Sequence, residues 1–256
     1  MNDYFKQLQL QKLLSDLTLQ IEWYQSLNST NLKAADQINS ALQTPVVIIS
    51  NQQTSGYGKR GRQFISKPGG LYLSLLTPIH NLNNDNIGLL TTGIVAVLQQ
   101  SINQYWQINC QIKWVNDLLF KHQKIAGILV EHPTSQLVII GIGLNLYQKD
   151  LTATLPQAAN LLAYIPKNIE IVQFTALLIR NLLEFLPDFS KSCYLNLYRQ
   201  HLILLNKAVQ IQLGHKVITG QVTDIDDKGN LLLKTKTGIT SLSMGEVTKV
   251  NWNSKT

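Results

Sequence analysis

A short loop of glycines and cations is the part of the sequence best suited to chemistry. It runs between Gln53 and Phe64, and its glycines and cations are Gly56, Gly58, Gly61, Lys59, Arg60 and Arg62. Glycine allows tight turns and a close approach of backbone to a ligand. Bare amide N–H groups beside positive charge bind phosphate or another small anion. Strand-like apolar runs at 46–50 and 71–76 flank the loop, so we expect a structured anion site.

A second polar group lies along a predicted hairpin. One strand ends near Asn116 and Asp117, and the next begins at Lys124, just before an apolar run that contains a glycine. In a hairpin of this length, Asp117 and Lys124 can lie close together at one end of the sheet. The spacing alone gives equal weight to a plain turn at Asn116-Asp117 and a solvent-exposed Lys124.

Three further polar positions have ordinary structural interpretations when each is taken singly. The run Ser29-Thr30-Asn31 is typical of a helix cap, and Gln53 is typical of an exposed loop. Asn145 ends the segment 141–145, Gly-Ile-Gly-Leu-Asn, whose glycines suit close packing of a strand against a helix. Asn145 itself either caps an element or faces a ligand from the end of the strand.

Motifs of several common enzyme classes do not occur. The chain has no Walker-type Gly-Lys-Ser/Thr and no serine in a nucleophile elbow. Its five histidines show no metal-ligand spacing, which argues against a metallohydrolase. Gly56, Gly58 and Gly61 spell G-x-G-x-x-G, but Lys-Arg fills the spacer and a strand, not a helix, is expected to follow, unlike a dinucleotide fingerprint.

The composition favours a globular protein with an anionic ligand. The chain has 256 residues, 45% of them hydrophobic and 14% charged, which argues against disorder. A formal charge of +7 and a pI near 9.3 suit an anion without singling out nucleic acid. Cys110 and Cys193 fit no metal or redox spacing, and we find no signal pattern and no apolar run of membrane-spanning length. We therefore expect a cytoplasmic protein.

The order of elements predicts an α+β fold. Helical patterns cover roughly 10–17, 29–39, 88–105 and 172–186, and strand-like runs cover 21–27, 46–50, 71–76, 111–114, 118–120, 125–130 and 137–142. Their irregular alternation favours a mixed β-sheet with packed helices over a doubly wound parallel sheet. Short strands at 209–213, 217–225, 231–236, 238–241 and 247–250 predict a small C-terminal β-barrel. We expect one larger domain at 1–205 and the barrel at 206–256.

Taken together and in order, these motifs resemble the biotin protein ligases. The matching segments are 29–31, the loop 53–62, Gly-Gly-Leu-Tyr-Leu-Ser at 69–74, Lys-Trp-Val-Asn-Asp at 113–117, 124–131 and 141–145. The resemblance covers about 21–250 and implies a mixed-sheet domain related to class II synthetases. It also implies activation of biotin with ATP and Mg²⁺ as biotinyl-5′-adenylate, followed by transfer to a lysine of a biotin carboxyl carrier protein, as in acetyl-CoA carboxylase.

The resemblance also implies roles for single residues. Biotin contacts fall on Ser29, Thr30, Asn31, Gln53, Tyr57, Gly58, Lys59, Gly69, Gly70 and Lys124. ATP and adenylate contacts fall on Gly56, Gly58, Lys59, Arg60, Arg62, Trp114, Asn116, Lys124 and Asn145. Catalytic roles fall on Lys124, Arg60 and Asp117. Asp117 either helps to hold Mg²⁺ or assists the attacking lysine amine, and both alternatives remain open here.

Departures from the family pattern qualify this interpretation. Tyr57 and Lys59 replace the two arginines of the usual Gly-Arg-Gly-Arg, and Val115 stands where proline is common. Lysine keeps the charge but loses the bidentate fork, so we expect looser retention of the adenylate. Only about twenty residues precede the first predicted strand, so we expect a monofunctional ligase, monomeric or weakly dimeric, that does not bind operator DNA.

Two rival functions share some of these features. A lipoate or octanoate ligase shares the domain and the adenylate chemistry, but its fatty substrate needs no partners for a ureido ring such as Ser29, Thr30 and Gln53. A non-catalytic basic binding module would explain the loop but leave the spaced Asn116, Asp117, Lys124 and Asn145 without a role.

Overall fold

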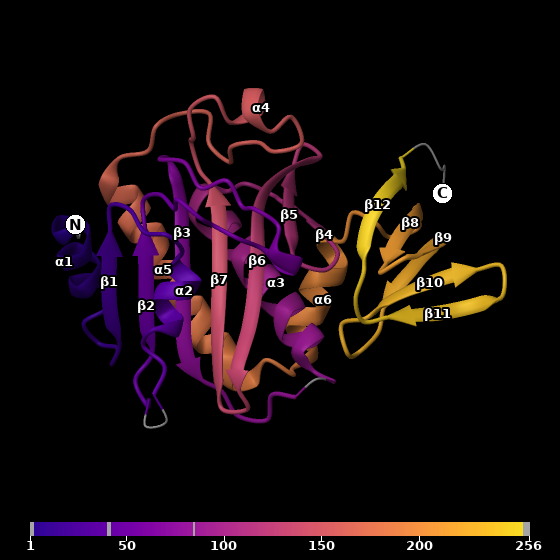
Figure 1. The fold of residues 1–256 in the computed structure, drawn as a ribbon, viewed down its shortest axis with the longest axis horizontal. Helices are drawn as coiled ribbons and strands as arrows, with labels where there is room; N and C mark the ends of the chain where they lie inside the picture. Colours follow the sequence, from indigo (N-terminus) through magenta and orange to yellow (C-terminus); the bar gives the residue numbers. More distant parts are fainter. Residues whose placement is uncertain (1–2, 40–41, 84, 253–256) are drawn as a thin grey trace.

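A seven-stranded mixed sheet forms the body of the protein (Figure 1). The computed structural model describes residues 3–39, 42–83 and 85–252. The strands are β1 (Gln20–Tyr24), β2 (Val46–Ser50), β3 (Gly70–Pro78), β4 (Gln111–Lys113), β5 (Asp117–Phe120), β6 (Gln123–Thr134) and β7 (Leu137–Asn145). Their order is β1-β2-β3-β7-β6-β5-β4, and β1 and β2 are parallel while the other neighbours are antiparallel. The mixed sheet expected from the sequence is confirmed.

Helices cover the two faces of this sheet unequally (Figure 1). The helices are α1 (Tyr4–Leu13), α2 (Thr30–Ala35), α3 (Ile87–Trp106), α4 (Leu151–Thr154), α5 (Asn168–Phe185) and α6 (Ser192–His201). The long helix α3 packs against α5 and α6, and α1 packs against α5, on one side of the sheet. The short helix α2 contacts β2, β3 and β7 on the other side. The sequence patterns predicted neither α4 nor α6.

Strand alternation decides which side chains face α2. Because successive side chains point to opposite faces of a strand, Leu71, Leu73 and Leu75 of β3 join the large core with the helices. The residues between them, such as Ser74, lie on the face that carries α2. Along β7 the same period separates Ile140 and Ile142 in the core from the residues 141, 143 and 145. That second face carries the polar residues of interest.

A five-stranded antiparallel sheet follows near the C-terminus. Its strands are β8 (Ala208–Leu213), β9 (Lys216–Ile225), β10 (Leu231–Thr235), β11 (Gly238–Leu242) and β12 (Glu246–Asn251). All five expected strands are present, in the order β11-β10-β9-β8-β12. In the described part of the chain, β11 and β12 are the two edges, so the pairing forms an open sheet where a closed barrel was expected.

Hydrogen bonds join this C-terminal sheet to the body. The Trp114 indole N–H donates to the Gly229 carbonyl over 3.2 Å, and the Arg199 Nη2 donates to the Ile225 carbonyl over 2.6 Å. These contacts place the β9–β10 connection beside α6 and the β4–β5 turn. The start of β12 lies beside the same turn, because a Cβ on Gly245 would lie 3.5 Å from the Trp114 ring. None of the described helices has both the length and the apolar character needed to cross a lipid bilayer.

Candidate active site

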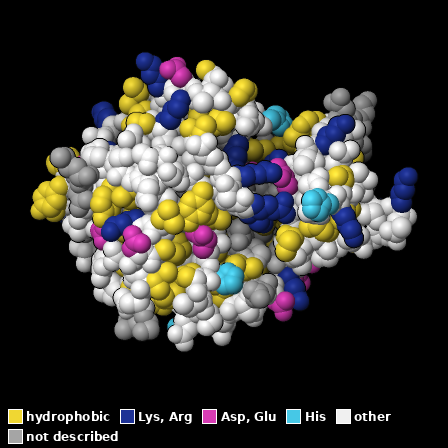
Figure 2. Space-filling view, viewed as in Figure 1, with side chains coloured by type: hydrophobic (Ala, Val, Ile, Leu, Met, Phe, Trp, Pro, Cys, Tyr) yellow, Lys and Arg dark blue, Asp and Glu magenta, His cyan; other side chains and the backbone are white. Residues whose placement is uncertain are grey.

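A cavity of about 340 Å³ collects most of the residues singled out in the sequence. The predicted site residues that line it are Ser29, Thr30, Asn31, Gln53, Tyr57, Gly58, Lys59, Arg60, Arg62, Trp114, Asn116, Asp117, Lys124 and Asn145. They come from α2, the glycine loop, the β4–β5 turn, β6 and β7. Figure 2 shows dark blue cations gathered in a hollow between the body and the C-terminal sheet.

Gly56, Gly69 and Gly70 are not among the residues that line the cavity. A Cβ on Gly56 would lie 2.5 Å from the Ser66 hydroxyl, and a Cβ on Gly70 would lie 2.1 Å from the Tyr72 hydroxyl. Gly69 has a φ of +96°, which glycine tolerates best. These glycines permit close packing and a tight turn, and the geometry does not place them against a ligand.

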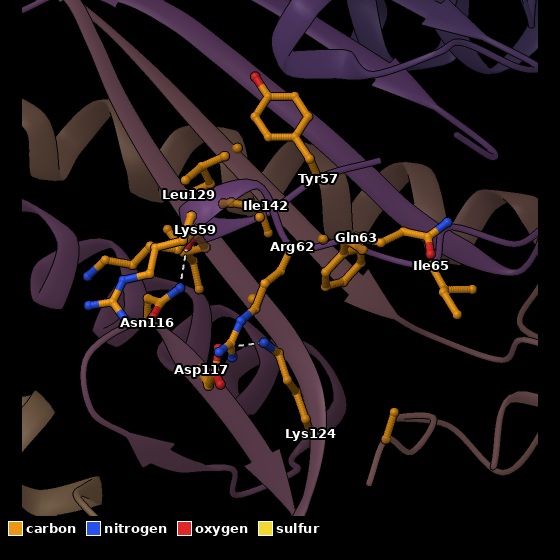
Figure 3. A pocket seen from close by; sticks show the side chains of 18 of the residues that line it. Tyr57, Lys59, Arg62, Gln63, Ile65, Asn116, Asp117, Lys124, Leu129 and Ile142 are labelled. Carbon is orange, nitrogen blue, oxygen red and sulfur yellow. Dashed lines mark hydrogen bonds and ion pairs between the residues drawn. The ribbon is translucent and has the colours of Figure 1, made fainter. Parts of the chain in front are cut away.

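The hairpin residues meet as the spacing allowed. The Lys124 Nζ lies 2.7 Å from an Asp117 carboxylate oxygen, with 34% of the lysine side chain and 24% of the aspartate side chain exposed. Figure 3 shows Arg62 of the glycine loop running toward the same pair. Segments more than fifty residues apart in sequence therefore bring their cations to one spot.

The glycine loop uses part of its own backbone. The Gly58 N–H donates to the Arg62 carbonyl over 2.7 Å, and the Gly61 N–H donates to the Gly58 carbonyl over 3.1 Å. The expectation of uncovered amides in this loop is therefore wrong for these two glycines. The side-chain cations, and not these amides, face the cavity as its positive groups.

Lys59 lines the cavity and is exposed to solvent. Its side chain reaches solvent, but the protein atoms around it withdraw enough water to lower the pKa of the ammonium. The positive charge of Arg60 lowers this pKa further, whereas Asp117 opposes the change. A lysine also lacks the forked guanidinium with which an arginine binds an anion.

The C-terminal sheet contributes directly to the cavity. Gly245, Glu246 and Val247 at the start of β12 line it. The Arg62 guanidinium makes a two-pronged ion pair with the Glu246 carboxylate, although 64% of the arginine side chain and 33% of the glutamate side chain are exposed. This pair, with burial opposing it, lowers the pKa of Glu246.

Polar side chains organise the opposite end of the cavity, at α2. The Ser29 hydroxyl accepts from the Leu32 N–H as the helix cap. The Gln53 Oε1 accepts from the Thr30 backbone N–H over 2.8 Å and from its hydroxyl over 3.1 Å, while Nε2 donates to the Ser66 hydroxyl over 2.7 Å. Gln53 is thus not a free loop residue, because it ties α2 to both ends of the glycine loop.

Tyr57 fills the position of the missing arginine with a neutral donor. Its hydroxyl donates to Glu131 Oε2 over 2.9 Å, and the Asn31 Nδ2 donates to the same oxygen over 2.6 Å. Burial raises the pKa of Tyr57 to about 12, and the Glu131 carboxylate adds to the rise. The phenol therefore keeps its proton at neutral pH and acts as a donor.

Two asparagines line the cavity from the sheet. The Asn116 Nδ2 donates to the Ile128 carbonyl over 2.7 Å, which fixes the β4–β5 turn against β6. The Asn145 Oδ1 accepts from the Gln148 Nε2 over 2.6 Å. Both amides are therefore held by protein contacts.

The lining residues that the sequence did not mark as site residues include Lys113, Phe64 and Glu246. Lys113 begins the segment 113–117 but was given no role, and Phe64 was treated only as the end of the glycine loop. Phe64 packs over Gly143, because a Cβ there would lie 2.5 Å from its ring. Glu246 belongs to the C-terminal sheet, and no local pattern in its sequence indicates a place beside the glycine loop.

The charges around the cavity favour an anion over a metal ion. Its cations are Lys59, Arg60, Arg62, Lys113 and Lys124, and its carboxylates are Asp117 and Glu246. Both carboxylates are ion-paired. Within residues 3–39, 42–83 and 85–252, no three His, Cys, Asp or Glu side chains are grouped as metal ligands.

Comparison with known proteins agrees with this arrangement. Residues 23–145 match the Biotin/lipoate A/B protein ligase family, and residues 204–250 match the Biotin protein ligase C terminal domain. The bifunctional ligase/repressor BirA of Escherichia coli is 30% identical over 218 residues, which cover 81% of this chain and 67% of that protein. The biotin–[acetyl-CoA-carboxylase] ligase of Mycobacterium tuberculosis is 26% identical over 214 residues, covering 79% of this chain and 78% of that protein.

A solved structure extends the similarity to three dimensions. The biotin protein ligase of Aquifex aeolicus in complex with biotin and ATP superposes with a TM-score of 0.73 at 25% identity, covering 89% of this chain and 97% of that one. Fold, cavity and sequence similarity thus agree. The chain belongs to the biotin/lipoate A/B protein ligase family, and within it to the biotin protein ligases.

Proposed function

We propose that this protein activates biotin with ATP to form biotinyl-5′-adenylate and pyrophosphate, and then transfers the biotinyl group to one lysine of a biotin carboxyl carrier protein domain. The observation that carries the proposal is the meeting of Lys124 with the cations of the glycine loop in one cavity. The opposite end of that cavity offers neutral donors and acceptors at α2. Such a cavity fits a ligand with an acid at one end and a polar ring at the other.

The first step joins two anions. A carboxylate oxygen of biotin attacks the α-phosphorus of ATP, and the bond to pyrophosphate breaks. The acid is ionised near neutral pH, so no base is needed, and the difficulty is to hold carboxylate and phosphate together. We assign this task to Lys124, with Lys59, Arg60 and Arg62 around it. Each charge-assisted hydrogen bond contributes roughly 1.5–3 kcal/mol, which offsets part of the repulsion.

Neutral groups would orient the two ends of the adenylate. We assign the ureido N–H and C=O groups of biotin to Ser29, Thr30, Asn31 and Gln53 at α2, with Tyr57 beside them. The nucleotide would lie against Trp114, Asn116 and Asn145 on the sheet. Gly58 leaves open space above the loop backbone, since the nearest atom to an added Cβ is 3.8 Å away.

The second step is acyl transfer. The carrier lysine amine attacks the acyl carbon of the adenylate, an amide forms, AMP leaves, and the amine loses a proton. Asp117 already holds Lys124 at 2.7 Å, so we assign it first the positioning of that lysine. Mg²⁺ would enter with the phosphates of ATP and reduce their charge, as suits an ion that keeps several waters and few protein ligands.

Narrower proposals concern partners and organisation. We propose residues 1–205 as the catalytic domain and 206–256 as a smaller domain that completes the cavity with Glu246. We further propose a cytoplasmic monomer or weak homodimer that acts on the carrier protein and uses neither operator DNA nor a membrane. Sedimentation with and without biotin and ATP measures the oligomeric state, and a retardation assay with operator-like duplexes measures DNA binding.

One assay tests the main proposal. The purified chain is incubated with ATP and Mg²⁺ and with biotin, lipoate or no acid, while pyrophosphate release and label transfer to a carrier domain are followed. We expect biotin-dependent release and transfer. Pyrophosphate release that requires lipoate, and not biotin, would indicate the rival ligase. If neither biotin nor lipoate stimulated release, a ligase function would be contradicted.

A further inference from the structure

Four elements are joined through one carboxylate at the α2 end of the cavity. Glu131 of β6 accepts from the Tyr57 hydroxyl over 2.9 Å and from the Asn31 Nδ2 over 2.6 Å. The Ser74 hydroxyl of β3, which is fully buried, lies 2.5 Å from the Asn31 Oδ1. The glycine loop is thus connected through Glu131 and Asn31 to the centre of the large sheet.

The register of the sheet explains why Glu131 points to this place. Glu131 pairs with Ile139, and Leu129 pairs with Gly141, so these residues share the face that carries α2. Gly141 leaves room for Asn31, because a Cβ there would lie 2.3 Å from the Asn31 Oδ1. The carboxylate therefore reaches Asn31 from the side and remains open toward the loop.

These contacts fix the Asn31 amide in one orientation. Its oxygen faces the Ser74 hydroxyl and its nitrogen donates to Glu131. A carboxylate only accepts hydrogen bonds, so Glu131 also selects a donor at position 57. The tyrosine hydroxyl supplies that donor where the family usually has arginine. In this chain, position 57 therefore contacts the sheet through a neutral donor.

We propose that Tyr57 and Glu131 form a clasp that positions Asn31 and holds the first half of the glycine loop over the biotin end of the cavity. Tyr57 is a positioning residue, acting through Glu131 and not on the reacting atoms. The clasp affects biotin more than ATP, since it lies at α2 and away from Lys124. The effect on biotin binding rests on the proposed function of the cavity. The attachment of the glycine loop to Glu131 does not depend on that function.

The first experiment measures how firmly the glycine loop is attached, and it does not depend on enzyme activity. Lys59, Arg60 and Arg62 make the loop a substrate for trypsin, so the rate of cleavage there reports how firmly it is held. We expect Tyr57→Phe to be cleaved in the loop several-fold faster than the wild type. The matched control is Tyr164→Phe, which removes a tyrosine–glutamate hydrogen bond outside the cavity, to Glu170, and should leave loop cleavage unchanged.

The second experiment reads the consequence for biotin. In biotin-dependent pyrophosphate exchange by the full chain, we expect Tyr57→Phe to raise the KM for biotin by about tenfold, as for loss of one hydrogen bond to a charged group, with the KM for ATP within about twofold. Glu131→Gln should act in the same direction. The double variant should be no worse than the worse single variant, because both changes act on the same Tyr57–Glu131 contact.

A rescue variant separates the clasp from a general packing role. Tyr57→Arg supplies another donor to Glu131, so its KM for biotin should stay near the wild-type value, and the same change in Glu131→Gln should give no such recovery. Unchanged loop cleavage in Tyr57→Phe, equal rises in both KM values, or fully additive effects would overturn the clasp. If the wild type were inactive but Tyr57→Phe were still cleaved faster in the loop, the proposed function and the role in biotin binding would be overturned. The attachment of the loop through Tyr57 and Glu131 would stand.

Discussion

The Lys124 ammonium lies 2.7 Å from the Asp117 carboxylate across the β5–β6 hairpin. Asp117 pairs in register with Gly127, and a Cβ on that glycine would lie 3.2 Å from both Cε and Nζ of Lys124. The glycine therefore lets the lysine side chain lie along its own strand toward the carboxylate. The β5–β6 hairpin thus fixes the position of Lys124, the cation to which we assign the largest role. The Arg62 side chain points toward the same place (Figure 3).

Removal of this cation should chiefly slow adenylation. We expect Lys124→Ala to lower kcat/KM for biotin-dependent pyrophosphate exchange by roughly 3–4 kcal/mol of transition-state stabilisation, or 10²–10³-fold, as for loss of one preorganised charge-stabilising group. Lys121→Ala is the control, because Lys121 is an exposed residue of the same hairpin outside the cavity. A folded Lys124→Ala variant with near-normal exchange would remove Lys124 from its assigned role.

The two steps separate the roles open to Asp117. If Asp117 positions Lys124, then Asp117→Asn should slow adenylation by about 10–100-fold, since a charge-assisted contact is worth roughly 1.5–3 kcal/mol. Transfer from chemically prepared biotinyl-adenylate to the carrier should change much less. Single-turnover measurements of each step give both numbers. A loss confined to transfer would instead support assistance to the lysine amine.

Part of the candidate cluster could be predicted from the sequence because its members lie in short local patterns. The hairpin spacing allowed Asp117 and Lys124 to meet, and Asn145 was expected at the end of a strand, where it lies. Those relationships follow from strand geometry over a few residues. The seven-stranded order, with β7 between β3 and β6, requires pairing between distant segments that no local pattern specifies.

Contacts between distant segments account for what was missed. Glu246 reaches Arg62 across 184 positions, and the Tyr57–Glu131 contact spans 74. The helix α6 was also missed, although Leu195 and Tyr198 lie three positions apart on its buried face and the helix packs against α3. The glycines at 56, 69 and 70, which were assigned to ligands, pack closely or form a turn outside the cavity lining, and their ligand role stays a prediction.

Gly141 should tolerate alanine only when Asn31 is shortened. An added Cβ would lie 2.3 Å from the Asn31 Oδ1, so Gly141→Ala should cost about 1–3 kcal/mol in the free energy of unfolding, as overpacking does. It should also raise the KM for biotin. Urea denaturation of Gly141→Ala, Asn31→Ala and the double variant provides the check. We expect the double variant to lose less than the sum of the two single changes, and strict additivity would show that the clash lies elsewhere.

The Arg62–Glu246 ion pair should add a small, pH-dependent stability. The pKa of Glu246 is lowered from the ordinary 4.5 chiefly by its hydrogen bonds with Arg62. The folded protein therefore binds fewer protons at Glu246 than the unfolded chain does. The contribution is therefore present above about pH 4.5 and lost as pH falls through the lowered folded pKa. The pair is largely exposed, so we expect at most about 1 kcal/mol.

Glu246→Gln isolates this contribution, since the other carboxylates titrate alike in both proteins. The difference in the free energy of unfolding between wild type and Glu246→Gln should shrink on acidification from about pH 7 to about pH 3. Urea titrations at several pH values supply the difference. If the difference in unfolding free energy grew as the pH fell, the ion pair would not be the source of the stability.

Restoring the arginine at position 59 should tighten the hold on the adenylate. Lys59 lines the cavity with a lowered pKa and without a bidentate fork. We expect Lys59→Arg to slow the release of labelled biotinyl-adenylate by about tenfold, as for one further hydrogen bond to a charged group. Lys67→Arg is the matched control, because Lys67 bonds to Thr154 outside the cavity. If Lys59→Arg released the adenylate as fast as the wild type, the lysine would not be what loosens retention, and the anion would be held mainly by Lys124 and Arg62.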